Sequence, residues 1–383
     1  MEAKDAANFV IDLLSLLVTR KGSDLFLIPG APPSMKVDGE LMPVAGSRLT
    51  PDHTLLFARA IMSEKQYTEL ERNRGVNFAI SPLDTKRKNP VGRFRCNTFI
   101  QRGSPAIVLR LIPQEIPNIK TMDLPEILTK IVMNKRGLVI LVGATGSGKS
   151  TTLAAMVDHR NENSRGHIIT IEDPIEILHH HKKCIVTQRE VGIDTLGWED
   201  ALKDMLRQAP DVILMGEIRD RETMEYAINF SETGHLVLAT LHANSANQAM
   251  DRILNFFPSD RRSQLLMDLS LNLRSIVAQR LIPRDNAPGR IAAVEILLNT
   301  PAIASHIKEG EVDVIKDFMS KSENVGMQTF DQALFKLYEN GDISYESALK
   351  NADSTNNVRL RIKLESRRKD GPAEDDASGL SIA

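Results

Sequence analysis

The chain of 383 residues has little cysteine, few aromatic residues and no excess of charge of either sign. Its two cysteines, Cys96 and Cys184, exclude a disulfide scaffold and a zinc site built from four thiolates. Lys and Arg number 48 against 50 Asp and Glu, giving a net charge of −2. This balance argues against a general nucleic-acid-binding protein, which is usually basic.

Long apolar runs are also missing. The most apolar segments, such as 138–142 and 236–241, fall far below the ~20 residues needed to span a bilayer. The opening residues 1–5 lack the basic start of a signal peptide. A hydrophobic content of 42% with 26% charged residues is ordinary for a globular protein. We therefore expect a cytoplasmic enzyme.

Residues 1–112 mix short helical and strand patterns. Apolar residues near helical spacing predict a helix over 6–18, and Asp38-Gly39 is a hairpin signal. The hairpin signal lies within 35–40, and the other elements expected here are strands at 23–28, 77–80, 94–101 and 106–112 and helices at 51–62 and 64–72. We interpret 1–112 as a small α+β domain. The proline-rich stretch 113–123 is predicted to be a linker.

From residue 124 the pattern changes to helical stretches that alternate with short, fully apolar runs. These runs are 138–142, 168–171, 212–215 and 236–241. Such runs are typical of a parallel sheet buried on both faces, so the fold class is α/β over 124–299. A helical segment is expected over 300–352. The polar stretch 353–383 has almost no apolar periodicity from residue 356 onward and is predicted to be a disordered tail.

The segment from Gly143 to Ser150 fits the pattern G-x-x-x-x-G-K-[ST] between an expected strand and an expected helix. Its glycines let backbone N–H groups face a polyphosphate, and the helix N-terminus adds positive charge. We expect Lys149 to reach the phosphates of ATP and Ser150 to hold Mg²⁺. The candidate nucleotide-binding residues are Gly143, Ala144, Thr145, Gly146, Ser147, Gly148, Lys149, Ser150 and Thr151.

Acidic residues follow two of the apolar runs. Glu217 comes after 212–215, with Gly216 where phosphate-loop enzymes normally place an Asp that holds Mg²⁺. Glu217 is therefore the best candidate to polarise the attacking water. The segment 172–176 adds the carboxylates Glu172, Asp173 and Glu176. Since parallel strands converge at their carboxyl ends, these groups should lie close together and need a cation between them.

Two histidines flank the run 236–241. His242 follows its carboxyl end and is a candidate sensor of the γ-phosphate, although a structural role remains open. His235 precedes the run and is a second candidate sensor, and an extended strand would separate the two by ~23 Å, which excludes a shared metal. His179, His180 and His181 stand near Cys184, yet no further ligand follows at a familiar spacing, so a solvated loop is the favoured interpretation.

Arginine usually stabilises the charge of the γ-phosphate, and often comes from a neighbouring subunit. The candidates are Arg93, Arg95 and Arg110 in the first domain and Arg207 and Arg219 in the second. Any one of them could instead be a surface charge. Arg93 and Arg95 alternate along an expected strand, which places both on one face.

Four segments together resemble a known family. Residues 143–152, 171–176, 216–220 and 233–242 are similar, in order and spacing, to the Walker A, Asp box, atypical Walker B and His box of the secretion-superfamily ATPases. The resemblance extends to about residue 350.

The resemblance is closest to the type IV pilus retraction ATPases, the PilT/PilU family, and within it to the PilU branch. Segments 188–191, 194–197 and 327–331 favour the family, and 301–309 together with the long polar tail favours that branch. The pilus-assembly ATPases usually carry a longer N-terminal region and a four-cysteine zinc element, and neither is present here.

The resemblance implies a PAS-like N-terminal domain, a RecA-like ATPase domain and a homo-hexameric ring that uses ATP and Mg²⁺. It places catalytic glutamates at Glu176 and Glu217 and puts first-domain arginines near the nucleotide. The implied partners are a PilT-like paralogue and an inner-membrane platform protein. The ring would work at the cytoplasmic face of that membrane, which it would contact only through partners.

Three interpretations stay open: an autonomous retraction motor, an accessory ring subunit that works through a PilT-like paralogue, and a RecA-type DNA motor. The charge balance and low aromatic content argue against the DNA motor. PilT-type motors carry an Ala-Ile-Arg-Asn-Leu-Ile-Arg-Glu pattern where this chain has 302–309. Ile303 and Ile307 preserve the apolar face, but Ala304 and Lys308 replace both arginines, which favours the accessory interpretation.

Overall fold

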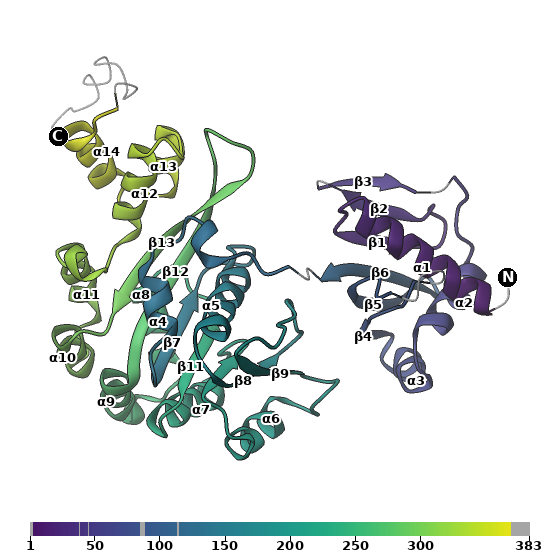
Figure 1. Cartoon of the computed structure of the whole chain (residues 1–383), viewed down its shortest axis with the longest axis horizontal. Coiled ribbons are helices and arrows are strands. Elements are labelled where there is room, and N and C mark those ends of the chain that lie inside the picture. The colour runs from purple at the N-terminus through teal and green to yellow at the C-terminus, as the bar shows by residue number, and fades with distance from the viewer. Residues whose placement is uncertain (1–2, 38, 45, 85–88, 113–114, 369–383) are drawn as a thin grey trace. The chain divides into compact units, whose positions relative to one another are not determined.

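The computed structural model describes residues 3–37, 39–44, 46–84, 89–112 and 115–368. The chain divides into two compact units (Figure 1). The first comprises Met1–Glu115 with Glu176–Leu178, and the second comprises Ile116–Ile175 with His179–Ala383.

The first unit is an antiparallel sheet with helices packed on one face. The sheet order is β3-β2-β1-β6-β5-β4. Its elements are α1 (Ala3–Thr19), β1 (Asp24–Leu27), β2 (Ser34–Val37), β3 (Glu40–Pro43), α2 (Pro51–Ile61), α3 (Glu64–Asn73), β4 (Gly75–Ile80), β5 (Arg93–Gln101) and β6 (Ser104–Ile112). The expected helices and strands of this region are confirmed. The hairpin residue Asp38 lies outside the described residues, and the PAS-like label remains a prediction.

Alternation along β5 shows how this sheet is covered. Phe94 and Cys96 are fully buried in the core beneath α1 and α2, whereas Arg95 is exposed on the opposite face. Burial raises the pKa of the Cys96 thiol far above its usual value, because the thiolate would lose its hydration. Arg93 and Arg95 therefore share the face that carries no helix, as their spacing predicts.

The second unit is built on a seven-stranded sheet of order β13-β12-β7-β11-β10-β8-β9. All neighbouring pairs are parallel except β12 with β13. Its strands are β7 (Gly137–Val142), β8 (Gly166–Glu172), β9 (Cys184–Glu190), β10 (Val212–Met215), β11 (Leu236–Leu241), β12 (Leu273–Pro283) and β13 (Arg290–Leu298). The four apolar runs are confirmed as neighbouring parallel strands, whereas β9, β12 and β13 were not anticipated.

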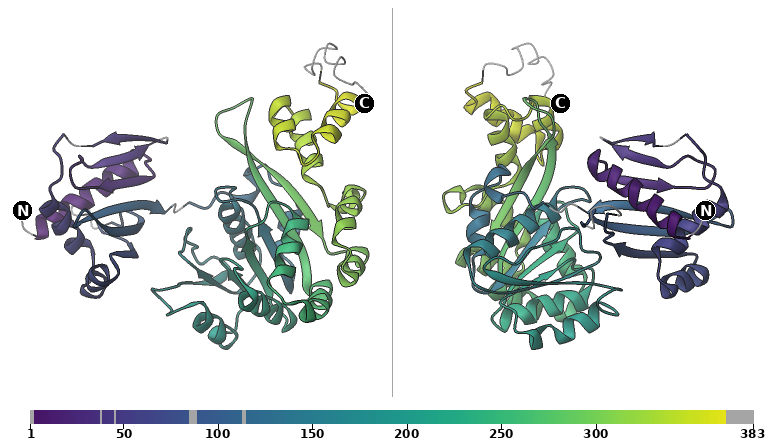
Figure 2. Two further views of the ribbon diagram at one scale, coloured as in Figure 1. Left: turned by 180° about the vertical axis from the view of Figure 1, so that it is seen from behind. Right: turned by 45° about the vertical axis from the view of Figure 1, so that its right-hand side comes forward.

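Helices cover both faces of this sheet (Figures 1 and 2). Leu138, Ile140 and Val142 of β7 point into one core, and Val139 and Leu141 into the other. One face carries α4 (Ile127–Val132) and α5 (Lys149–Asn163). The other is packed by α6 (Trp198–Met205), α7 (Arg221–Glu232), α8 (Ala246–Asn255) and α9 (Arg262–Asn272). The α/β expectation is confirmed.

The chain approaches this sheet through the short 3₁₀ turn η1 (Ile119–Thr121). Ile119 is buried in the core that contains α4 and α5, so the end of the predicted linker 113–123 packs against the second unit. Residues 113–114 lie outside the described residues, and the linker itself remains a prediction.

The C-terminal part continues the helical layer with α10 (Pro301–Glu309), α11 (Val312–Ser320), α12 (Phe330–Glu339) and α13 (Tyr345–Asn351), as predicted. The expectation of a disordered tail over 353–383 is wrong for its first part, which forms α14 (Thr355–Glu365). Val358 and Ile362, one helical turn apart, are buried against the preceding helices. Residues 369–383 lie outside the described residues. In the described part of the chain, no helix is long and apolar enough to cross a membrane.

Candidate active site

The loop 143–148 joins the carboxyl end of β7 to the N-terminus of α5, as the motif predicts. Gly143 has a φ of 155°, and a Cβ there would lie 2.4 Å from Ser147 Oγ and 2.6 Å from the carbonyl oxygen of Gln279. Gly148 has a φ of 85°, in the left-handed region that glycine tolerates. Both glycines are thus required by the way the loop folds back on itself.

Polar groups in this loop are arranged to receive an anion. Lys149 is largely buried, and its Nζ donates to the carbonyl oxygens of Gly143 at 2.7 Å and Ala144 at 3.0 Å. The buried hydroxyl of Ser147 has no hydrogen-bond partner among the described residues. A buried polar group of this kind calls for a ligand or water. Donor groups, a cation and a helix N-terminus at one place fit a polyphosphate.

Gln279 on β12 holds this loop from the side. Its amide nitrogen donates to the carbonyl oxygen of Ser147 at 2.8 Å, and its amide oxygen accepts from the hydroxyl of Thr152 at 2.8 Å. The side chain is 3% exposed, so both bonds are shielded from water. Sequence reasoning missed this residue, because no local pattern links a glutamine to a loop about 130 positions earlier.

Glu217 lies just beyond β10 and next to the end of β11. Its Oε2 accepts from Arg219 Nε at 3.0 Å, and its Oε1 lies 3.2 Å from His242 Nε2. The Gly216 carbonyl oxygen accepts from the Thr240 hydroxyl, and the Ile218 N–H donates to the Thr240 carbonyl oxygen at 2.8 Å. Neighbouring strand ends therefore bring Glu217 and His242 together, as expected for the carboxyl edge of a parallel sheet.

Arg219 supplies the cation that the clustered carboxylates require. Its NH1 donates to Asp173 Oδ2 at 3.3 Å while its Nε binds Glu217. Burial opposes the charged guanidinium, but the two carboxylates outweigh it and raise the pKa of Arg219. Glu172 accepts instead from Thr170 at 2.6 Å and Gln188 at 3.1 Å. These two bonds hold the Glu172 carboxylate from β8 and β9, and its role beside Glu217 and Asp173 stays a prediction.

Gly216 explains the missing Walker B aspartate. A Cβ at this position would lie 3.2 Å from the carbonyl oxygen of Ile171, 3.3 Å from the Cα of Glu172 and 3.3 Å from the ring of Trp198. These contacts are tighter than ordinary packing, so a side chain at 216 needs its neighbours to shift. The first carboxylate after β10 is therefore that of Glu217, whose catalytic role stays a prediction.

Comparison with known proteins identifies this arrangement. The family model of the Type II/IV secretion system protein family matches residues 7–334, most of the chain. The chain belongs to this family. Among its relatives is the type IV pilus ATPase PilU of Pseudomonas aeruginosa, 55% identical over 96% of this chain and 93% of that protein. The pilus retraction ATPase PilT of the same organism is 39% identical over 90% and 98%.

The solved structures agree with this placement. The crystal structure of the pilus retraction motor PilT with bound ADP has a TM-score of 0.84 and 41% identity, covering 91% of this chain and 98% of that one. The Legionella pneumophila ATPase DotB has a TM-score of 0.74 and 26% identity. The chain is thus an ATPase with the α/β fold of the Type II/IV secretion family, in its PilT/PilU branch.

Two residues that were predicted to contact the nucleotide, His235 and Arg207, lie at the edge of the sheet opposite to the phosphate loop of their own chain. His235 lies at the amino end of β11, beside Gly137 at the start of β7, and its Nδ1 is 3.1 Å from Thr233 Oγ1 and from the Phe230 carbonyl oxygen. The loop leaves β7 at the opposite end. His235 as a sensor of the γ-phosphate of its own chain is therefore wrong, and His242 remains a candidate.

Arg207 is the second such residue. It lies in the 3₁₀ turn η2 (Leu206–Gln208), 84% exposed in its side chain, with Asp204 at 3.2 Å. The adjacent Gln208 binds His167 near the start of β8, which is the amino edge of the sheet. Arg207 as a nucleotide contact within its own chain is therefore wrong.

The remaining candidates belong to the first unit. Arg95 and Arg110 face each other across β5 and β6, and Arg110 Nε binds the buried carboxylate of Asp24 at 2.7 Å. Both arginines are exposed, and Arg110 has a structural partner within its unit. Glu176 is exposed and belongs to the first compact unit. The nucleotide roles of Glu176, Arg93, Arg95 and Arg110 stay predictions.

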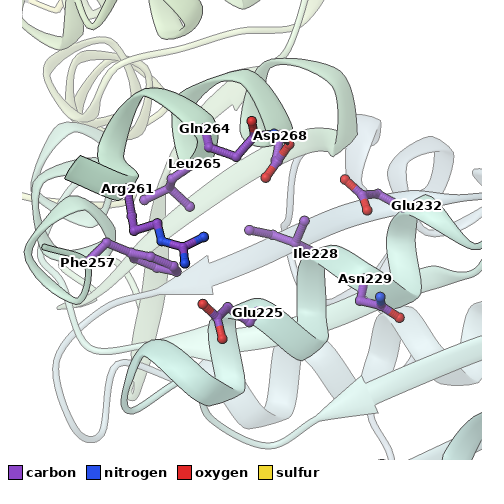
Figure 3. A pocket seen from close by; sticks show the side chains of 9 residues that line it. All are labelled: Glu225, Ile228, Asn229, Glu232, Phe257, Arg261, Gln264, Leu265 and Asp268. Atoms are coloured by element: carbon purple, nitrogen blue, oxygen red, sulfur yellow. Dashed lines mark hydrogen bonds between the residues drawn. The ribbon is translucent and has the colours of Figure 1, made fainter. Parts of the chain in front are cut away.

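A small pocket lies elsewhere, between α7 and α9 (Figure 3). It has a volume of about 220 Å³ and includes Phe257 and Ile228 together with the charged groups Glu225, Arg261 and Asp268. None of its lining residues comes from the phosphate loop, and the two helices belong to the layer opposite α5. The pocket is therefore distinct from the nucleotide site.

Proposed function

We propose that this ATPase forms a homo-hexamer that assists type IV pilus retraction and twitching motility through ATP hydrolysis. The observation that carries the proposal is the placement of Glu217 and His242 at the carboxyl ends of β10 and β11, because β11 is the neighbour of β7, from which the phosphate loop leaves. Identity of 55% with a pilus ATPase over nearly the whole chain supports the same process.

The chain's own groups account for the chemistry. Phosphates in the loop would draw Lys149 Nζ from the carbonyl oxygens of Gly143 and Ala144, and would accept from the Ser147 hydroxyl. Glu217 would orient the water that attacks the γ-phosphate, with His242 bound to the same carboxylate. Ser150, in the first turn of α5, would hold Mg²⁺, which neutralises charge on the phosphates when bound.

The proposed setting follows from the family. The hexamer would work with a PilT-like paralogue and an inner-membrane platform protein at the cytoplasmic face of the membrane. The accessory role is favoured by α10, where Ile303 and Ile307 are fully buried while Lys308 is exposed. The packing face of this helix is kept, and the arginines of the PilT-type pattern are replaced by Ala304 and Lys308.

ATP turnover by the purified full-length chain with Mg²⁺ tests the chemistry. Glu217→Gln should bind ATP yet lose roughly 10²- to 10⁴-fold in kcat, the range that a general base contributes. Lys149→Ala should lose ATP binding. The matched control is Glu225→Gln, which removes a surface carboxylate paired with Arg221 on α7 and should leave turnover unchanged. Wild-type turnover by Glu217→Gln would contradict the assignment, and stimulation by DNA would favour the DNA motor.

Retraction in cells that lack every paralogue tests the accessory role. Cells carrying only this protein should assemble pili but retract them poorly, and adding a PilT-like paralogue should restore retraction. Normal retraction by this protein alone would contradict the accessory role and leave an autonomous motor.

A further inference from the structure

Arg219 occupies a position between three groups of the second unit. Its Nε and NH1 bind Glu217 and Asp173, and its guanidinium carbon lies 5.7 Å from the ring centre of Trp198. Trp198 is the only tryptophan of the chain. Carboxylates at two edges and an aromatic ring on one face determine where the planar guanidinium lies.

Each contact comes from a different element. Asp173 follows β8, Glu217 follows β10, and Trp198 is the first residue of α6. The ring of Trp198 packs against the apolar core of the second unit, and its indole nitrogen is buried without a hydrogen-bond partner among the described residues. The ring therefore has a fixed position, and Arg219 links it to the Glu217 carboxylate.

We propose that Arg219 is the positioning residue for Glu217, seated on Trp198 and tethered by Asp173, and is not itself a contact of the γ-phosphate. Arg219 holds Oε2 of Glu217 and leaves Oε1 for the attacking water. A carboxylate oxygen has two lone pairs, so Oε1 can accept from His242 and from water together. This inference rests on the proposed role of Glu217. In this arrangement, the Asp173 carboxylate holds Arg219 in place.

Kinetics distinguish positioning from direct contact. Arg219→Ala should lower kcat roughly 10- to 100-fold with unchanged ATP affinity, because a misplaced catalytic group costs about this much. Arg219→Lys should recover part of the loss, since it keeps the charge and loses the planar fork. Asp173→Asn should change kcat in the same direction by a smaller factor.

Arg221 provides the matched control. It pairs with one carboxylate, Glu225 at 2.7 Å, where Arg219 pairs with two. Like Arg219, it has its guanidinium carbon 5.7 Å from the centre of an aromatic ring, that of Phe257, and neither of these contacts is with Glu217. Arg221→Ala should therefore keep wild-type kcat. Melting curves of all variants, followed through the emission of Trp198, check that each one folds.

The decisive arm is the double variant. In the Glu217→Gln background, Arg219→Ala should cause no further loss, because a residue that acts through Glu217 has nothing left to position. Additive losses, or a loss of ATP affinity, would overturn the inference and make Arg219 a phosphate contact. Wild-type kcat in Arg219→Ala with an inactive Glu217→Gln would overturn the inference alone. Wild-type turnover in Glu217→Gln would overturn the proposed function itself.

Discussion

At the residue scale, the site differs at a few positions from the usual site of phosphate-loop enzymes. The strand-end aspartate expected in phosphate-loop enzymes is replaced by Gly216, where a side chain would crowd Ile171, Glu172 and Trp198. Two of the carboxylates that remain, those of Glu217 and Asp173, are paired with Arg219. Features at this scale lead to measurable predictions.

Gly216→Ala should destabilise the second unit by roughly 1–3 kcal/mol, the usual cost of overpacking. The physical reason is the approach of the new Cβ to 3.2 Å from the carbonyl oxygen of Ile171. Thermal melting measures the effect. The control is Gly197→Ala, where the Cβ would meet nothing within 4 Å and the backbone is extended. Equal melting temperatures for both variants would contradict the argument.

His179 should make stability depend on pH. Burial is the largest cause that lowers its pKa from 6.5 to about 4, and the neighbouring Lys182 and His180 lower it further, against Asp158. Between these pH values the unfolded chain binds a proton that the folded chain does not, so this contribution is complete above pH 6.5 and is lost as the pH falls toward 4.

The measurement is the melting temperature of the wild-type chain and of His179→Asn across this range. The wild-type value should fall more steeply with acidification, because the variant has no imidazole to protonate in the unfolded state. Parallel curves would show that His179 does not contribute.

At the element scale, the strands of the second unit differ in how clearly the sequence predicts them. The runs that form β7, β8, β10 and β11 are continuous and apolar, since both their faces are covered by helices. The edge strand β9 is not continuously apolar, because the polar residues 187–190 follow Val186.

The strand β12 is hidden for a different reason. Its buried Gln279 binds the phosphate loop, and the next residue, Arg280, donates to the carbonyl oxygen of Asn351 at 2.7 Å and pairs with Asp353 at 2.7 Å. These polar groups are satisfied only by segments distant in sequence, so no local pattern predicts the strand. The loop, Glu217 and His242 were predictable because their motifs are local, whereas Gln279 and Trp198 were not.

Helix α14 gives a prediction at this scale. Ile362→Ala should cost about 2–5 kcal/mol, because it opens a cavity where the side chain is 4% exposed. Leu364→Ala is the control on the same helix, with a residue that is 73% exposed, and should change stability by less than about 0.5 kcal/mol. The free energy of unfolding in denaturant measures both. Similar small effects would mean that α14 does not pack on α12 and α13.

At the scale of the whole molecule, the account requires more than one chain. In the described part of the second unit, Arg219 is held by carboxylates and Arg207 lies at the far edge of the sheet. We therefore expect an arginine from the first unit of a neighbouring chain to neutralise the γ-phosphate. Arg95 is the best candidate, since Arg110, although also exposed, is paired with Asp24.

Specific activity should accordingly rise with protein concentration until the ring forms, with mass measured by light scattering at each point. Mixing provides a sharper form of the test. Chains with Lys149→Ala cannot use ATP but keep Arg95, and chains with Arg95→Ala keep the loop, so mixed rings should recover activity that neither variant shows alone. Full activity in a monomer would contradict shared sites.

The account's central claim is that ATP hydrolysis at Glu217 assists pilus retraction. The most direct measurement is the frequency and force of retraction in cells that keep every paralogue and carry Glu217→Gln in place of the natural chain, at equal protein level. The account predicts weaker and fewer retractions and reduced twitching, restored by the wild-type gene. Normal retraction by cells with the inactive chain would contradict it.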